Sequence, residues 1–295
     1  MIMKKSNWVL IASISAITCS FFVVMHNNVK AALTNQGSEN KHFVSKPEGA
    51  DADGFLFRES FENRNFTKDW FRTEWATSNS ATRSDSVASD GNYSLRMQLN
   101  RYDPYVAGSR RAELVSYLEK SPNIERWYSF DVFLPASYKI DSIPETLAQW
   151  HVQTTAAQKN EHISPEVSLR VEYDKWRIWV IYDVPPTGNT DKYYGSKRFA
   201  LPKLEFDKWT KWVFHIKYSH GDDGVVQVWE NGVLQVDYKG PDFYDSEMGP
   251  YFKIGIYKPA WKTNDWLSPV TQRVVFYDNI KIGDQDMSLA KMSGN

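Results

Sequence analysis

Residues 251–258 read Tyr251-Phe252-Lys253-Ile254-Gly255-Ile256-Tyr257-Lys258, and this alternation decides the fold. Successive side chains of a β-strand point to opposite faces, so the phenylalanine and the two isoleucines form one apolar face. Lys253 and Tyr257 share the other face, with Gly255 between them leaving room for a ligand. The run predicts a strand whose outer face is either simply solvated or moves protons on an anionic substrate.

Other short runs rich in Val, Ile, Phe, Tyr and Trp are separated by turn signals, and we find no long amphipathic helix between them. Asn231-Gly232 marks the clearest turn, because this pair tolerates the positive φ angles of a tight hairpin. Residues 185–190, with the sequence PPTGNT, predict a long surface loop. The pattern predicts an all-β fold, an antiparallel β-sandwich with a groove on its concave face. The expected strands are residues 54–61, 93–99, 110–117, 127–134, 147–153, 167–173, 176–182, 209–218, 225–230, 233–238, 251–257 and 273–282.

The N-terminal region differs from this predicted domain. Residues 1–31 combine Lys4 and Lys5, an apolar stretch and a small-residue ending, which is typical of a signal peptide. The apolar stretch is also long enough to remain as a membrane anchor. Residues 32–53 are polar and aperiodic and predict a flexible linker. We therefore expect one folded domain, residues 54–295, in a secreted or periplasmic protein.

Charge and cysteine content narrow the function classes. The formal net charge is −1, and it becomes −4 without residues 1–31, which contain three lysines and no acidic residue. This balance argues against a nucleic-acid or membrane-surface binder. The only cysteine, Cys19, lies in the apolar stretch, so the domain has no disulfide framework and must be held by its core. We expect a monomer without stable membrane contact once the signal is removed.

Two further strands carry polar side chains on one face. In the strand around Gln149 and His151, an amide and an imidazole point the same way. In the strand around Arg111 and Glu113, an arginine lies beside a carboxylate. Each has an ordinary alternative, a structural histidine or a surface ion pair. Their combination with the Lys253 and Tyr257 strand is much more specific.

These three strands resemble the motif strands of jelly-roll polysaccharide lyases. Arg-Ala-Glu-Leu, Gln-Trp-His and Tyr-Phe-Lys-Ile-Gly-Ile-Tyr look like those of alginate lyases. A more extended likeness, over residues 54–284, is to the group that holds glucuronan lyases and heparin lyase I. The chain has Val115 where alginate lyases carry a second arginine, and it lacks the basic insertion of heparin lyase I. The resemblance implies a concanavalin A-like jelly roll and a glucuronan-type polyuronate lyase, with alginate or glycosaminoglycan as alternative substrates.

By the resemblance, His151 and Tyr257 match the catalytic pair and Lys253 a residue at the site. The chemistry of β-elimination fits the same residues. Arg111 and Gln149 can neutralise the sugar carboxylate, which must happen before the C5 proton is acidic enough to remove. Either His151 takes this proton and Tyr257 protonates O4, or Tyr257 does both and His151 assists neutralisation. Lys253 would favour the ionised phenol.

Other candidate residues are expected to contact the substrate or a metal. Substrate contacts are predicted for Glu113, Arg170, Lys258 and Trp261, the last as a platform for a sugar ring. No cofactor is required, and the resemblance implies a possible structural Ca²⁺ held by Glu59, Glu62 and Asp278. Further aromatic residues near the expected groove are Trp176, Trp179, Tyr193, Tyr194 and Trp266.

Two other classes of protein share this predicted fold. A glycoside hydrolase needs a pair of carboxylates across the scissile bond, and the nearest approach here is Glu172-Tyr173-Asp174, without a third acid at the expected spacing. A carbohydrate-binding module would explain the fold and the aromatic residues without requiring His151, Tyr257, Lys253 and Arg111 to converge.

Overall fold

The computed structural model describes residues 50–153, 163–184 and 193–294, which belong to one compact unit of residues 43–295. The predicted signal peptide, most of the predicted linker and the predicted loop at residues 185–190 lie outside the described residues. Asp51, near the C-terminal end of the predicted linker, contacts the start of the first strand. Its side chain accepts hydrogen bonds from the backbone of Asp53 and Phe55.

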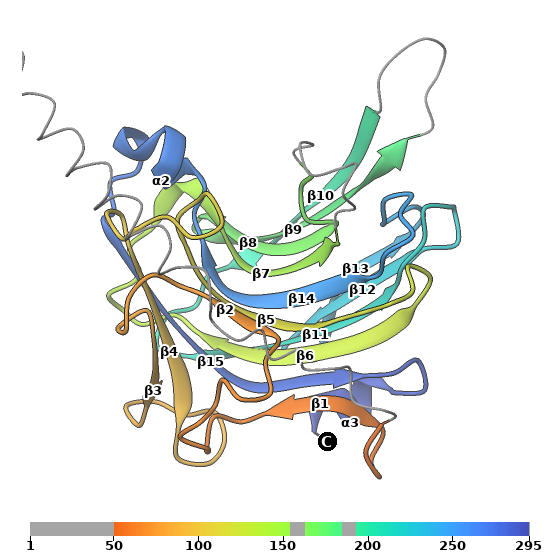
Figure 1. The fold of residues 1–295 in the computed structure, drawn as a ribbon, viewed down its shortest axis with the longest axis horizontal. Helices are drawn as coiled ribbons and strands as arrows, with labels where there is room; N and C mark the ends of the chain where they lie inside the picture. The colour runs from red at the N-terminus through yellow and green to blue at the C-terminus, as the bar shows by residue number, and fades with distance from the viewer. Residues whose placement is uncertain (1–49, 154–162, 185–192, 295) are drawn as a thin grey trace, which may run out of the picture. The chain divides into compact units, whose positions relative to one another are not determined.

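The fold is a sandwich of two antiparallel sheets, as the sequence predicts (Figure 1). The first sheet has the order β13-β12-β11-β6-β15-β4-β3, with β1 also paired to β15. Its strands are β1 (Phe55–Glu59), β3 (Ala81–Ser84), β4 (Ser94–Asn100), β6 (Glu125–Phe133), β11 (Trp209–Lys217), β12 (Val225–Glu230), β13 (Val233–Lys239) and β15 (Gln272–Gly283).

The second sheet has the order β10-β9-β8-β7-β14-β5-β2 and carries all three motif strands. Its strands are β2 (Arg72–Glu74), β5 (Arg111–Leu118), β7 (Asp141–Val152), β8 (Val167–Tyr173), β9 (Lys175–Val184), β10 (Tyr193–Lys203) and β14 (Pro250–Tyr257). The motif strands are neighbours, because β14 pairs with β5 on one side and with β7 on the other.

Short helical segments follow β14 and β15. They are α2 (Ala260–Thr263), the 3₁₀ turn η1 (Asp265–Leu267) and α3 (Leu289–Ser293). In the described part of the chain, no helix has the length and apolar character needed to cross a membrane.

The core fills the space between the two sheets and is rich in aromatic rings. Trp150 of β7 and Phe252 of β14 are buried and pack ring against ring, with their centroids 5.0 Å apart. From the opposite sheet, Phe214 approaches Trp150 to 4.4 Å. These residues are the apolar halves of the alternating motif strands, so core packing holds the polar halves on the outer side.

The predicted hairpin is confirmed. β12 and β13 pair up to Glu230 and Val233, and Asn231 and Gly232 between them have φ angles of 49° and 81°. Both angles are positive, as a two-residue turn of this kind requires. Three strands were not predicted, namely β2, β3 and β10, and each lies at the edge of its sheet.

Gly255 has a different role from the predicted one. Its φ is 138°, and a Cβ atom there would lie 2.1 Å from the carbonyl oxygen of Ala112 on β5. The space left by the missing side chain is therefore taken by the neighbouring backbone and not by a ligand. The pairing with β7 shifts between Ile254 and Tyr257, so Gly255 sits at a bulge in β14.

We predict that Gly255→Ala lowers the free energy of unfolding by about 3 kcal/mol or more, because it adds a clash to an unfavourable φ angle. Gly232→Ala is the matched control. Gly232 also has a positive φ, but an added Cβ would meet nothing within 4 Å, so we expect a loss of only about 1–2 kcal/mol. Urea unfolding of both variants measures the difference, and equal losses would contradict the packing role of Gly255.

Candidate active site

The candidate site lies on the outer face of the second sheet, the side turned away from the core. Figure 1 shows β7, β8 and β14 bowed, with the concave side facing away from the first sheet. Lys253 of β14 pairs with Val115 of β5 and Gln149 of β7, whereas Tyr257 pairs with Arg111 and Thr146. The register therefore arranges the outer face in rows that run across the strands.

Glu74 on β2 is the centre of an ion network on this face, and sequence reasoning missed it. Its carboxylate accepts hydrogen bonds from Lys253 Nζ at 2.7 Å, Arg111 Nη1 at 3.1 Å and Arg72 Nε at 2.7 Å. Lys253 is 3% exposed and Glu74 is 4% exposed, so their charges are compensated away from water. Burial alone would raise the pKa of Glu74, but the charges of Lys253, Arg111 and Arg72 outweigh it and lower the pKa to about 2.

A signal for Glu74 was present in the sequence. Arg72-Thr73-Glu74 repeats the Arg-x-Glu pattern of Arg111-Ala112-Glu113, and the two carboxylate-bearing residues are register partners. A strand of three residues gives no periodicity that would place it beside β5. The repeated charge pattern was the only available indication.

Glu113 holds two neighbouring side chains, and its contact with substrate stays a prediction. It is 2% exposed, and its oxygens accept hydrogen bonds from Arg111 Nη1 at 3.1 Å and from the amide of Gln149. The predicted pairing of Arg111 with Glu113 is thus present. Glu113 joins Arg111 and Gln149 across the intervening strand β14 and fixes both side chains.

Tyr257 is half-buried and lies between two arginines. The guanidinium of Arg111 sits 4.4 Å from the centre of its ring. On the other side, Tyr257 pairs with Thr146 of β7, and Thr146 pairs with Arg170 of β8. Within the described part of the chain, the Tyr257 hydroxyl has no hydrogen-bond partner. The Lys253 ammonium is paired with Glu74.

His151 lies at the other end of β14, opposite Tyr251. Its ring stacks on that of Tyr251 with centroids 5.7 Å apart and an angle of 10°, and its Nδ1 is 2.9 Å from the carbonyl oxygen of Val152. Burial lowers the pKa of His151 to about 4, and the charge of Lys253 adds to this effect. The imidazole is therefore neutral at physiological pH.

The register separates the two predicted catalytic side chains. His151 of β7 pairs with Tyr251 of β14, which is six residues from Tyr257 along the same strand. Six residues of extended strand span about 20 Å. In the described structure no hydrogen bond or ring contact joins them. Tyr251, which the sequence interpretation did not consider, is the phenol beside His151.

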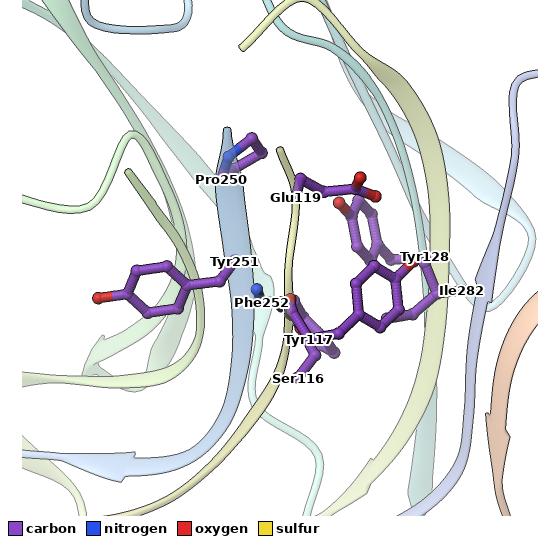
Figure 2. Close-up of a pocket in the computed structure, with 8 residues that line it drawn as sticks. All are labelled: Ser116, Tyr117, Glu119, Tyr128, Pro250, Tyr251, Phe252 and Ile282. Carbon is purple, nitrogen blue, oxygen red and sulfur yellow. Dashed lines mark hydrogen bonds between the residues drawn. The ribbon is translucent and has the colours of Figure 1, made fainter. Parts of the chain in front are cut away.

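Figure 2 shows the direction of the Tyr251 side chain. It projects to one side of β14, whereas Phe252, Tyr117 and Tyr128 lie on the other side. The eight drawn residues, Tyr251 among them, line a small pocket beside β14.

The predictions that Lys258 and Trp261 contact substrate are wrong, because both side chains are buried. Lys258 is 0% exposed, and its ammonium pairs with Asp141 at 2.9 Å and Glu145 at 3.1 Å. Lys258 follows Tyr257 directly, so strand alternation turns it inward. Trp261 is 2% exposed and belongs to the hydrophobic core.

Each of the three predicted calcium ligands accepts hydrogen bonds from backbone groups. Glu59 accepts a hydrogen bond from the backbone of Phe61, Glu62 from the backbone of Asn92 and Tyr93, and Asp278 from that of Ser89 and Asp90. The described residues contain no cluster of three His, Cys, Asp or Glu side chains that could hold a metal ion. The Ca²⁺ site at Glu59, Glu62 and Asp278 stays a prediction.

We predict that Glu74→Gln lowers the free energy of unfolding by about 3–5 kcal/mol, because Lys253 and Arg111 lose a buried counter-charge. Folding lowers the pKa of the Glu74 carboxyl group. Its contribution to the free energy of unfolding is therefore complete above the pKa of the unfolded state and is lost as the pH falls towards 2. Urea unfolding at neutral and acidic pH measures both effects. Glu205→Gln, which removes an exposed partner of Lys208, is the control and should cost about 0–1 kcal/mol. Equal losses in the two variants would contradict a central role for Glu74.

We also predict that the His151 ring stays neutral down to about pH 5 and titrates near pH 4. Its pKa is lowered on folding, so its contribution to stability is complete above about pH 6.5 and declines as the pH falls towards 4. NMR titration of the histidine ring protons, with His151→Gln for assignment, measures the midpoint. A midpoint near 6.5 would contradict the buried environment.

Comparison with known proteins relates the chain to a protein family. The family model described as "Polysaccharide lyase" matches residues 61–281. No curated protein sequence matches the chain.

Solved structures show the same fold at low sequence identity. The endo-β-1,4-glucuronan lyase from the fungus Trichoderma reesei has a TM-score of 0.65 at 16% identity, over 79% of this chain and 100% of that one. An alginate lyase from Aplysia kurodai has a TM-score of 0.53 at 13% identity, over 78% and 99% of the two chains. An alginate lyase from Chlorella virus has a TM-score of 0.52 at 12% identity, over 78% and 99%. The predicted jelly-roll fold is thereby confirmed, and with the family match over residues 61–281, the chain belongs to the polysaccharide lyases.

Proposed function

We propose that this polysaccharide lyase cleaves a polymer of uronic acids by β-elimination, with Tyr257 as both catalytic base and catalytic acid. The observation that carries the proposal is the position of the Tyr257 phenol, whose hydroxyl has no described partner and whose ring lies between Arg111 and Arg170. An anionic sugar on the outer face would meet positive charge on both sides of a group able to transfer protons.

The reaction needs the sugar carboxylate to be neutralised first. The C5 proton becomes acidic only when the charge that develops on the carboxylate is stabilised, as in an oxyanion hole. Arg111 suits this role because Glu74 and Glu113 hold its Nη1 while the guanidinium faces the Tyr257 ring. Gln149, fixed by Glu113, can donate or accept a further hydrogen bond.

The bond changes then follow on one side of the sugar. Tyr257, as the phenolate, takes the C5 proton, the C4–C5 double bond forms and the C4–O4 bond breaks. The same phenol returns the proton to the departing O4. The products are a new chain end and a 4,5-unsaturated uronate.

Assigning both steps to Tyr257 follows from the register. A base and an acid that act on C5 and O4 of one sugar must each be within hydrogen-bond reach of neighbouring atoms. His151 lies six β14 positions from Tyr257 and has its own contacts with Tyr251 and Val152. We therefore assign His151 to binding of the polymer and not to proton transfer.

This assignment favours particular substrates. In glucuronate and mannuronate the C5 proton and O4 lie on the same side of the ring, so one phenol can serve both. In guluronate they lie on opposite sides, which requires two groups. Glucuronan is the first candidate, supported by the TM-score of 0.65 to a glucuronan lyase, and mannuronate-rich alginate is the second.

The N-terminal region fits an enzyme that meets its polymer outside the cytoplasm. We propose that residues 1–31 direct export and that the domain acts as a secreted or periplasmic monomer, with the anionic polysaccharide as its partner. Loss of the signal would leave a net charge of −4, so contact with the polymer depends on the local cations of the outer face.

We predict that Tyr257→Phe lowers kcat on glucuronan by about 10²–10⁴-fold, because the phenol performs the proton transfers. Absorbance of the unsaturated uronate measures the rate on glucuronan, mannuronate-rich alginate, guluronate-rich alginate, heparin and hyaluronan. Tyr251→Phe is the matched control, since it removes the same hydroxyl from the other end of β14, and it should retain most of the activity.

Three outcomes would contradict the proposal. Cleavage of guluronate-rich alginate, or loss of activity in His151→Ala equal to that in Tyr257→Phe, would restore a two-residue mechanism. New reducing ends without absorbance would indicate hydrolysis.

A further inference from the structure

A second group of cations lies on the outer face, on strands β8 to β10. The guanidinium of Arg170 lies 4.0 Å from the ring centre of Trp179, and that of Arg198 lies 4.1 Å from a ring centre of the same indole. Trp179 is the register partner of Arg198 on β10 and of Ser168 on β8. One half-buried tryptophan therefore holds two arginines in place.

These arginines lack the compensation found around Glu74. Arg170 donates from Nε to the hydroxyl of Ser168 at 2.8 Å, which is a neutral partner. The nearby carboxylate of Glu172 pairs with Arg177 at 3.3 Å. Among the described residues, neither Arg170 nor Arg198 has a carboxylate within ion-pair distance. Two like charges on one indole repel each other, and a bound anion would relieve this repulsion.

The pKa of Arg170 is consistent with this arrangement. Burial lowers it to about 10, and the charge of Arg198 adds to the lowering while Tyr257 opposes it. In the sheet, β8 lies between β14 and β10, so Arg170 lies between Tyr257 and Arg198.

Trp179 and Arg198 are too far from Gln149 to bind the same sugar, whereas Arg170 lies between the two places. Across the sheet, Gln149 pairs with Ser168 and Ser168 pairs with Trp179. Two strand spacings, about 10 Å, separate Trp179 from Gln149, which is more than the length of one sugar ring. A polymer that crosses the strands would therefore bring a different sugar to Trp179.

We propose that Arg170, Trp179 and Arg198 form a binding subsite for the carboxylate of a second uronic acid in the same polymer chain. The inference rests on the proposed function and extends it to substrate selection. Guanidinium groups bind carboxylates through paired hydrogen bonds, and stacking on the indole orients them in advance. The enzyme should therefore favour polymers that carry charge on sugars beyond the one that is cleaved.

The test compares Arg198→Ala and Trp179→Ala with Lys197→Ala. Lys197 is exposed and precedes Arg198, so its side chain lies on the other side of β10. Lys197→Ala therefore removes one positive charge without touching the subsite. KM and kcat are measured on glucuronan and on mannuronate-rich alginate. Binding of glucuronan is measured separately by calorimetry with each substitution placed in the Tyr257→Phe protein.

We expect Arg198→Ala to raise KM and the calorimetric Kd by about tenfold to a hundredfold with kcat nearly unchanged, since it removes binding away from the reacting atoms. Trp179→Ala should act in the same direction, and Lys197→Ala should change neither. Equal effects of Arg198→Ala and Lys197→Ala, or no binding of glucuronan to the Tyr257→Phe protein, would overturn the subsite. If the wild-type protein forms no unsaturated product, the proposed reaction fails, and the calorimetric comparison still decides the subsite.

Discussion

Lys253 and Arg111 can occupy the outer face only because Glu74 and Glu113 neutralise them. A buried ammonium or guanidinium without a partner is strongly unfavourable, and here two carboxylates on neighbouring strands meet both cations. Glu113 also holds Gln149, so the same interaction fixes the amide. Glu74 and Glu113 thus hold Lys253 and, through its Nη1 atom, Arg111 in place. Among the described residues, Arg170 and Arg198 have no carboxylate within ion-pair distance and can meet an anionic polymer.

The sequence predicts the sandwich well because core strands depend on local alternation. The alternation in β14 predicts a strand that is buried on one face. The Asn-Gly pair predicts a tight turn, because both residues tolerate positive φ angles. The three strands that were not predicted are edge strands. β2 has only three residues, and β10 contains Gly195 and Pro202 among charged side chains. Edge strands tolerate these features, but the features obscure the alternation of apolar and polar residues that predicts a strand.

The site was less predictable, because the sequence shows which residues share a strand face but not which residues lie opposite one another. Arg111, Gln149, Lys253 and Tyr257 do reach one face of one sheet. The register is set only when the strands pair. It places His151 beside Tyr251 and the Lys253 ammonium beside the Glu74 carboxylate. Lys258 and Trp261 are different, since alternation already turned Lys258 towards the core. In that case proximity in sequence to Tyr257 was mistaken for proximity in space.

The bulge at Gly255 has a consequence for how this enzyme can change over evolutionary time. It sets the phase of the strand between Lys253 and Tyr257, and both side chains reach the outer face only in that phase. Gain or loss of one residue between them would turn the phenol into the core and a core side chain outward. New specificities can therefore arise by substitution within the rows of the sheet, whereas changes in length within β14 would remove the proposed catalytic group.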